Sequence, residues 1–287
     1  MSSQITTAFV NQFSSNVQLL SQQRGSLLRG SVSEESVTGE KAFFDQVGAT
    51  AAVKRTSRHQ DTQILDTPHS RRMVTMDSYE WADLIDDADK IRMLIDPTST
   101  YAQAAASAIG RSMDDAIITA ATGTAKTGSS GSTDTAMASG NIIAHGSADL
   151  TIAKLINAKK ILDEGSVDPS IPRYIAVAPA QVEALLGTTQ ITSSDFNTVK
   201  ALVAGEVDTF MGFKFIMSTR LAVASSIRTC FAWAEDGIKL AVGKDVMAKI
   251  DERADKSYST QVFYCATFGA TRMEEAKVVS ILCDESA

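Results

Sequence analysis

The sequence predicts a mixed fold of the α+β class, and three observations lead to this prediction. The Ala-rich stretch 97–122 repeats apolar residues at helical spacing. The segments 43–77 and 246–287 alternate apolar and polar residues, as strands with one buried face do. In 173–187 a strand-like apolar run leads through a proline into a short helix. No internal repeat and no obvious linker divides the chain.

Composition limits the classes of protein to consider. With 287 residues, 44% hydrophobic and 21% charged, the chain has the values of a soluble globular protein with one large or two smaller domains. The 27 Lys and Arg against 34 Asp and Glu give a net charge of -7, which argues against a dedicated nucleic-acid binder. The N-terminus lacks a signal-peptide pattern and no long apolar stretch occurs, so we expect a cytoplasmic protein without membrane contact.

The N-terminal region is predicted to be an arm. Apolar residues at helical spacing between Phe9 and Leu20 predict a short amphipathic helix. The segment from Gly25 to Glu40 has no sustained period, so it is expected to be extended and to need another surface for order. Such an arm suggests a partner surface.

The segment 43–77 predicts a long two-stranded hairpin with a wide polar connection that contains Pro68. Alternation runs through 47–53 and again through 72–76. An isolated hairpin with little apolar surface is only marginally stable, so this one is expected to contact a neighbour.

Charge is distributed unevenly around this hairpin. The hairpin is basic, and the segment directly after it is acidic, with Leu84 and Ile85 suggesting one apolar face of a helix. We expect the basic residues to contact the acidic face of an adjacent subunit, because no interleaved aromatic residues suit nucleic-acid bases. The candidate interface residues are Lys54, Arg55, Arg58, Arg71, Arg72, Glu80, Asp83, Asp86 and Asp87.

The helix at 97–122 has clear end signals, with Asp96 as N-cap, Pro97 at the first position and Gly123 as the stop. A small-residue loop follows, predicted to be flexible. A second amphipathic helix is expected next, with one face formed by Ile152, Leu155, Ile156, Ile161 and Leu162.

The C-terminal half is expected to be rich in strands. Apolar runs at 212–219, 230–234 and 238–243 predict strands. The alternating segments 246–253, 258–272 and 277–285 are interpreted as strands of one antiparallel sheet.

No catalytic, cofactor-binding or metal-binding residue is predicted. The loop 123–130 has Ala125 before Lys126 and follows a helix, so it does not fit a phosphate-binding loop. A metal site at His59, Asp61, Asp66 and His69 would lie in a polar loop without rigid backing.

The remaining reactive residue types do not suggest catalysis either. His145 has no obvious partner in its Gly/Ser-rich loop. The spacing of the three cysteines matches no zinc site, and we expect their thiols to be reduced and mostly buried. They are Cys230, Cys265 and Cys283.

The order of arm, charged hairpin, long Ala-rich helix, small-residue loop, α/β segment and C-terminal strands resembles the major capsid proteins of tailed bacteriophages. These share the shell-forming fold named after phage Hong Kong 97. The stretches that resemble short-form members, in sequence order, are VTGEKAFFDQVG, DTPHSRRMV, DPTSTYAQAAASAIGRSMDDAIITAATGTA, YIAVAPAQVEALLG, GFKFIMSTRL and FGATRMEEAKVV. The resemblance covers nearly the whole chain and is most specific between Val37 and Thr124.

The resemblance implies an assignment of parts. It makes 1–38 the N-terminal arm and 39–76 an extended loop over a neighbouring subunit. The remaining parts would be a peripheral domain at 77–164 with a spine helix at 97–122, an axial domain at 165–245, and strands at 246–287 that return to the peripheral domain.

The implied function is that of a major capsid protein whose hexamers and pentamers form an icosahedral head around double-stranded DNA in the virion. Implied partners are a separate scaffolding protein, a portal protein at one vertex, a decoration protein as a further candidate, and packaged DNA through non-specific contact. Assembly would occur in the bacterial cytoplasm. Some members cross-link subunits through Lys and Asn; Lys54 lies in the corresponding hairpin, but no Asn or Glu matches, so no cross-link is predicted.

Three alternatives remain at this point. An encapsulin-type compartment shares the fold and encloses enzymes in place of DNA. A cytoplasmic hydrolase would use the Asp-rich segment, although no nucleophile, base and orienting group match. A tail or decoration protein usually lacks a long helix preceded by a hairpin.

Overall fold

The computed structural model describes residues 22–85, 98–187 and 209–286. The predicted helix before residue 21, the Asp96 and Pro97 cap and the segment 195–205 lie outside these ranges. The long helix is confirmed as α2 (Thr98–Thr122), about 37 Å long at 1.5 Å per residue. At its end the Gly123 N–H donates to the Thr119 carbonyl at 2.8 Å.

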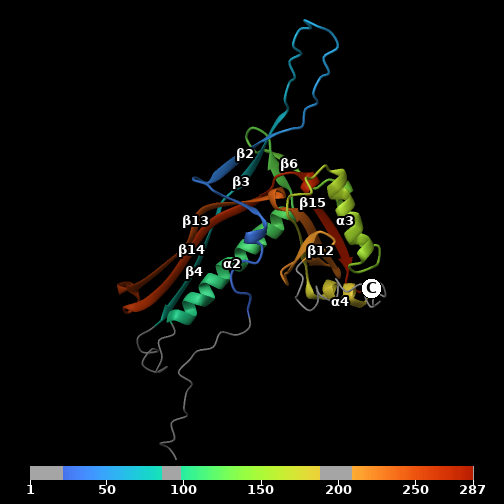
Figure 1. Cartoon of the computed structure of the whole chain (residues 1–287). Coiled ribbons are helices and arrows are strands. Elements are labelled where there is room, and N and C mark those ends of the chain that lie inside the picture. The colour runs from blue at the N-terminus through green and yellow to red at the C-terminus, as the bar shows by residue number, and fades with distance from the viewer. Residues whose placement is uncertain (1–21, 86–97, 188–208, 287) are drawn as a thin grey trace, which may run out of the picture.

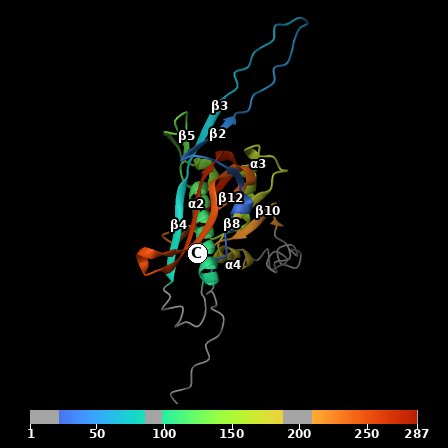
Figure 2. The same ribbon diagram turned by 90° about the vertical axis from the view of Figure 1, so that its left-hand side faces the viewer.

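The predicted hairpin is confirmed, but its first strand lies before the alternation at 47–53 and shares only Val47 with it. β2 (Lys41–Val47) and β3 (His69–Thr75) pair antiparallel. The ladder ends where the Gly48 N–H donates to the Pro68 carbonyl at 2.8 Å, so the alternation through 49–53 is not a strand. The connection 48–68 projects far from the body (Figures 1 and 2).

One sheet lies along α2 and is built from segments far apart in the chain (Figure 1). Its order is β1 (Ser33–Ser36), β13 (Ile238–Arg253), β14 (Ser259–Arg272) and β4 (Asp77–Ile85). The segment 81–85, expected to be helical, is therefore part of a strand. β4 pairs antiparallel with β14, and Tyr79 stacks on Phe268 with ring centroids 4.4 Å apart.

A second sheet carries the helices of the central segment. Its order is β7 (Ile142–Ile143), β15 (Val278–Asp284), β12 (Ile227–Ala234), β8 (Arg173–Val177), β10 (Phe213–Met217) and β9 (Thr209–Phe210), and β11 (Val223–Ala224) pairs with β12. β8 and β10 pair in parallel, and the helix that the proline at 179 begins lies between them in the chain. The accompanying helices are α3 (Ile152–Glu164) and α4 (Pro179–Gly187).

The prediction that the three last segments share one antiparallel sheet is wrong for β15. It pairs with β12 in the second sheet, whereas β13 and β14 belong to the first. The physical reason is that both faces of β15 are buried, which suits the second sheet because α3 packs against this strand there.

The loop predicted to be flexible contains a small hairpin. β5 (Ala125–Thr127) and β6 (Thr133–Thr135) extend the β2–β3 pair into a four-stranded sheet. Gly128 and Gly131 have φ of 93° and 67°, values that favour glycine in this turn. The short 3-10 helices are η2 (Arg29–Ser31), η3 (Ser139–Asn141), η4 (Glu235–Gly237), η5 (Ala254–Lys256) and η6 (Glu275–Lys277).

A single hydrophobic cluster joins α2, α3 and both large sheets. Leu155 and Leu162 of α3 are fully buried in it, but Ile156, which was predicted on the same face, is exposed. The core also contains Cys230 and Cys283, while Cys265 is half-buried, and all three are free thiols as predicted. The hydrogen bond with the adjacent Cys283, together with burial, raises the pKa of the Cys230 thiol well above its usual value.

Candidate functional site

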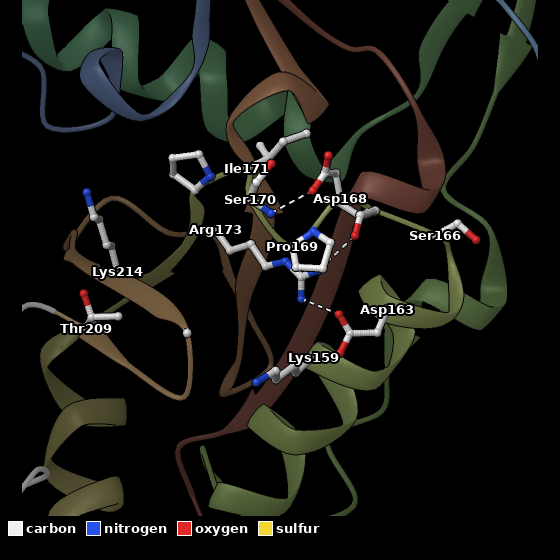
Figure 3. Close-up of a pocket in the computed structure, with 13 residues that line it drawn as sticks. Lys159, Asp163, Ser166, Asp168, Pro169, Ser170, Ile171, Arg173, Thr209 and Lys214 are labelled. Atoms are coloured by element: carbon white, nitrogen blue, oxygen red, sulfur yellow. Dashed lines mark hydrogen bonds and ion pairs between the residues drawn. The ribbon is translucent and has the colours of Figure 1, made fainter.

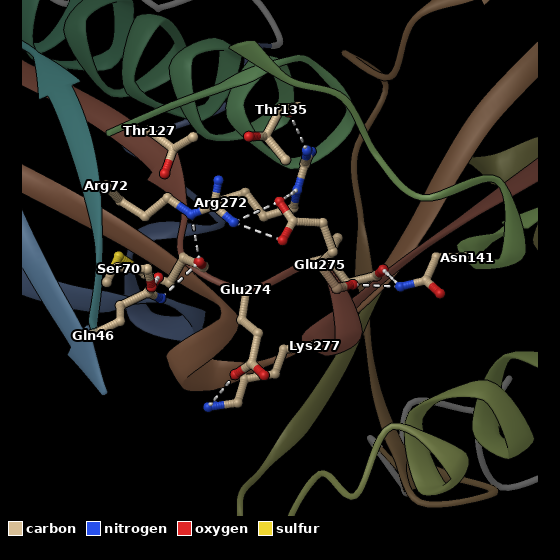
Figure 4. A network of polar contacts seen from close by, with 12 residues as sticks. Gln46, Ser70, Arg72, Thr127, Thr135, Asn141, Arg272, Glu274, Glu275 and Lys277 are labelled. Atoms are coloured by element: carbon tan, nitrogen blue, oxygen red, sulfur yellow. Dashed lines mark hydrogen bonds and ion pairs between the residues drawn. The ribbon is translucent and has the colours of Figure 1, made fainter. Parts of the chain in front are cut away.

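The base of the projecting hairpin is fixed to the body by two buried arginines (Figure 4). Arg72 on β3 is 7% exposed. Its Nε donates to the Met273 carbonyl at 2.9 Å, and its Nη2 donates to both carboxylate oxygens of Glu275, at 2.8 and 2.6 Å. Arg272 is 0% exposed, and its Nη1 donates to the Gly123 carbonyl at 2.7 Å.

These two guanidinium groups share one carboxylate. Arg272 Nε lies 3.7 Å from Glu275 Oε1, and its Nη1 also reaches the Ala121 carbonyl at 3.1 Å, next to the C-terminus of α2. Burial lowers the pKa of Arg272, and the charge of Arg72 adds to this lowering, while Glu275 opposes it. The network therefore joins the hairpin base, the end of α2 and the β14–β15 connection.

Arg72 is thus placed differently from the other predicted interface residues. Its guanidinium is buried and hydrogen-bonded within its own chain, so it stabilises the subunit itself. Arg72→Glu is therefore expected to destabilise the subunit itself, so a joint reversal of Arg71 and Arg72 would not report on assembly alone.

Arg71 lies at the surface on the opposite side of β3. Its Nε donates to Asp45 Oδ1 at 2.5 Å, and its guanidinium lies 5.4 Å from the centre of the Phe43 ring. The hydrogen bond from Arg71 lowers the pKa of Asp45. Lys54, Arg55 and Arg58 are exposed on the connection 48–68.

The predicted acidic residues do not form one face within the described chain. Glu80 is exposed, whereas Asp83 is half-buried on the opposite face of β4, which it shares with Tyr79 and Trp81. Asp86 and Asp87 lie outside the described residues.

Exposed apolar side chains on the hairpin were missed by the sequence reasoning. Ile64 is 94% exposed, Val53 50% and Leu65 46%, all on the connection 48–68. The sequence contained a signal, since Ile and Leu stand together in an otherwise polar stretch, SRHQDTQILDTPHS. Exposed apolar side chains gathered on one segment mark an interaction surface.

A surface cavity of about 580 Å³ lies between α3, β8 and β10 (Figure 3). Arg173 donates to the Val167 carbonyl at 3.2 Å and pairs with Asp163 at 2.7 Å. Lys214 lies 5.7 Å from the centre of the Tyr174 ring. The lining residues do not include a nucleophile with a base and an orienting group.

The structure also places the residues that the sequence analysis considered as metal ligands. His59, Asp61, Asp66 and His69 lie exposed along or beside the hairpin connection. Among the described residues, no three His, Cys, Asp or Glu side chains group as metal ligands. Within the same residues no helix is long and apolar enough to cross a bilayer.

The subunit thus has a packed body and a long projecting hairpin that a buried arginine holds at its base. A projecting, exposed segment of this kind is typical of a subunit that contacts a second copy. Residues 5–285 match the model of a family described as phage capsid protein. The chain belongs to this family and is a major capsid protein, a subunit of the icosahedral head. The match favours this interpretation over the encapsulin-type compartment and the hydrolase.

Solved phage capsids share the fold. The capsid of cyanophage P-SCSP1u is 17% identical, with a TM-score of 0.76 over 97% of this chain and 94% of that chain. The capsid of Ralstonia phage GP4 is 10% identical, with a TM-score of 0.75 over 96% and 95%. The head of Helicobacter pylori bacteriophage KHP40 is 10% identical, with a TM-score of 0.74 over 97% and 96%. No curated protein sequence matches the chain.

Proposed function

We propose that the subunit assembles into hexamers and pentamers in which the connection 48–68 lies on a neighbouring subunit. The proposal rests on the position of this connection, which projects away from the body of its own subunit (Figure 2). Almost all of its residues are exposed. A segment of this kind gains its order from a second copy.

Apolar contact is the main attraction that this connection offers. Ile64 is nearly fully exposed in the single subunit, and burying an Ile side chain contributes about 1.5–3 kcal/mol. Val53 and Leu65 are half-exposed beside it and add to the same surface. Because every subunit repeats the contact around a closed shell, modest attraction per copy is sufficient.

The basic side chains of the connection set the register of this contact. Lys54, Arg55 and Arg58 are exposed and have no ion-pair partner among the described residues. The proposed partner residues on the adjacent subunit are Glu80, Asp83, Asp86 and Asp87. Surface pairs of this kind add little affinity each, so their role is orientation.

The proposal extends to the assignment of parts and to the partners. The arm 1–38, extended loop 39–76, peripheral domain 77–164, axial domain 165–245 and return strands 246–287 are proposed units, with β15 joining the sheet of the axial part. A scaffolding protein, a portal protein and a decoration protein are proposed partners, and assembly is placed in the host cytoplasm. With a net charge of -7, contact with packaged double-stranded DNA would be non-specific.

The test compares Ile64→Ser with Thr62→Ser, a conservative change two residues away on the same connection. Both chains are expressed, checked for folding by circular dichroism and imaged by electron microscopy. We expect Ile64→Ser to give folded subunits with few or no closed shells, and Thr62→Ser to give shells like the wild type. Normal shell yield from the triple variant Val53→Ser, Ile64→Ser, Leu65→Ser contradicts the proposal.

A further inference from the structure

Asp114, in the middle of α2, is a buried carboxylate, and its hydrogen-bond donors among the described residues come from the arm before β1. Its side chain is 0% exposed. Its Oδ1 accepts from Ser26 Oγ at 2.5 Å and from the Leu28 N–H at 3.1 Å. Its Oδ2 accepts from the Leu27 N–H at 3.1 Å and from Gln23 Nε2. Four hydrogen bonds to one buried carboxylate therefore hold this short segment of the arm against α2.

The backbone of the arm crosses the helix directly beside this carboxylate. Gly110 lies one turn before Asp114, and a methyl group on it would overlap the backbone of Gly25. Arg111 extends the same contact, because its Nη1 donates to Gln22 Oε1 at 2.9 Å. The absence of a side chain at Gly110 is what permits this close approach.

Further along, the arm is held by other means. Leu28 is fully buried in the core, and Trp233 Nε1 donates to the Ser31 carbonyl at 2.8 Å. β1 then pairs in parallel with β13. The described part of the arm is therefore ordered by its own subunit, which corrects the expectation that a neighbour orders it.

We propose that Asp114 and Gly110 form a seat on α2 for residues 23–28 of the arm. The seat fixes the arm to its own subunit, so any reach of the arm toward another subunit begins upstream of Gln22. The contact lies within one chain, so its test is independent of particle formation.

The chemistry of the seat requires a carboxylate. Each oxygen of Asp114 receives two donors, whereas an asparagine offers one acceptor oxygen and an NH₂ group. In Asp114→Asn the NH₂ group would face two donors, which leaves buried polar groups without partners. The variant has nearly the same size, so its effect reports on hydrogen bonding.

Limited trypsin digestion of the full chain tests the seat, because Arg24 and Arg29 lie in and beside the seated segment. We expect cleavage at these two sites to be about tenfold faster in Asp114→Asn than in the wild type, since cleavage follows the open population. The matched control is Asp115→Asn, which changes the next residue, an exposed partner of Arg220, and should cleave like the wild type. Intact mass identifies each cut, and hydrogen exchange at Leu27 and Leu28 reports release directly.

A second variant removes the space for the arm without touching the carboxylate. Gly110→Ala favours the helix itself but places a methyl group where Gly25 crosses. It should increase cleavage at Arg24 and Arg29 while cleavage at the exposed Lys54, Arg55 and Arg58 stays as in the wild type. Wild-type cleavage rates in Gly110→Ala and Asp114→Asn overturn the proposal. If Asp114→Asn unfolds the whole chain, the result for Gly110→Ala alone decides.

Discussion

The buried arginine at the hairpin base gives the sharpest stability prediction. Arg72→Glu removes a guanidinium that is 7% exposed and places a carboxylate beside Glu275, whose side chain is 24% exposed. Breaking a buried ion pair costs about 3–5 kcal/mol, and we take the lower end, about 3 kcal/mol, because Glu275 retains some solvent. Arg71→Glu changes the adjacent residue, whose ion pair with Asp45 is solvent-exposed, and should leave stability unchanged within error.

Urea unfolding of unassembled subunits, followed by tryptophan fluorescence, measures this difference. With a slope of about 3 kcal/mol/M, a loss of about 3 kcal/mol lowers the midpoint by about 1 M for Arg72→Glu. Glu275→Gln should have a comparable effect, because it leaves two buried guanidinium groups without a carboxylate. Equal midpoints for Arg71→Glu and Arg72→Glu would refute the reasoning that burial decides the effect.

Three further predictions concern other parts of the fold. Leu155→Ala, in the core under α3, should lower the free energy of unfolding by about 3 kcal/mol in the same urea assay. Gly269→Ala would place a methyl group against the Thr75 carbonyl, so we expect a lower melting temperature by calorimetry, and an unchanged value argues against this close contact. Hydrogen bonds from Arg228 and then Gln181 lower the pKa of Glu285 below 4.5. The contribution of Glu285 is therefore present above pH 4.5 and lost as pH falls through its lower folded-state pKa. Glu285→Gln should flatten stability against pH in that window, and a profile that parallels the wild type contradicts the assignment.

Features carried by local patterns were predictable from the sequence. The helix α2 follows from Ala-rich helical spacing and the Gly123 stop, and strand β3 follows from the alternation through 72–76. The burial of Arg72 was also predictable, because Arg72 alternates with Val74 and Met76 and therefore lies on the same buried face of the strand. Its neighbour Arg71, one residue away, points to solvent.

Features that depend on non-local pairing were not predictable. The sequence of β15 shows a strand but not that its partner is β12 and that β13 and β14 belong to another sheet. Likewise the arm has no period of its own, and only the fold brings residues 23–28 to Asp114. Ile156 fits the apolar face of α3 by spacing, but no element of the described chain covers it.

Electron microscopy of the purified product shows whether this chain builds a closed shell. The chain is expressed alone and with a co-expressed scaffolding protein from the same phage, and both products are separated by size and imaged. We expect closed icosahedral shells, or hexamers and tubes made of the same subunit. A stable monodisperse monomer in both preparations contradicts the account.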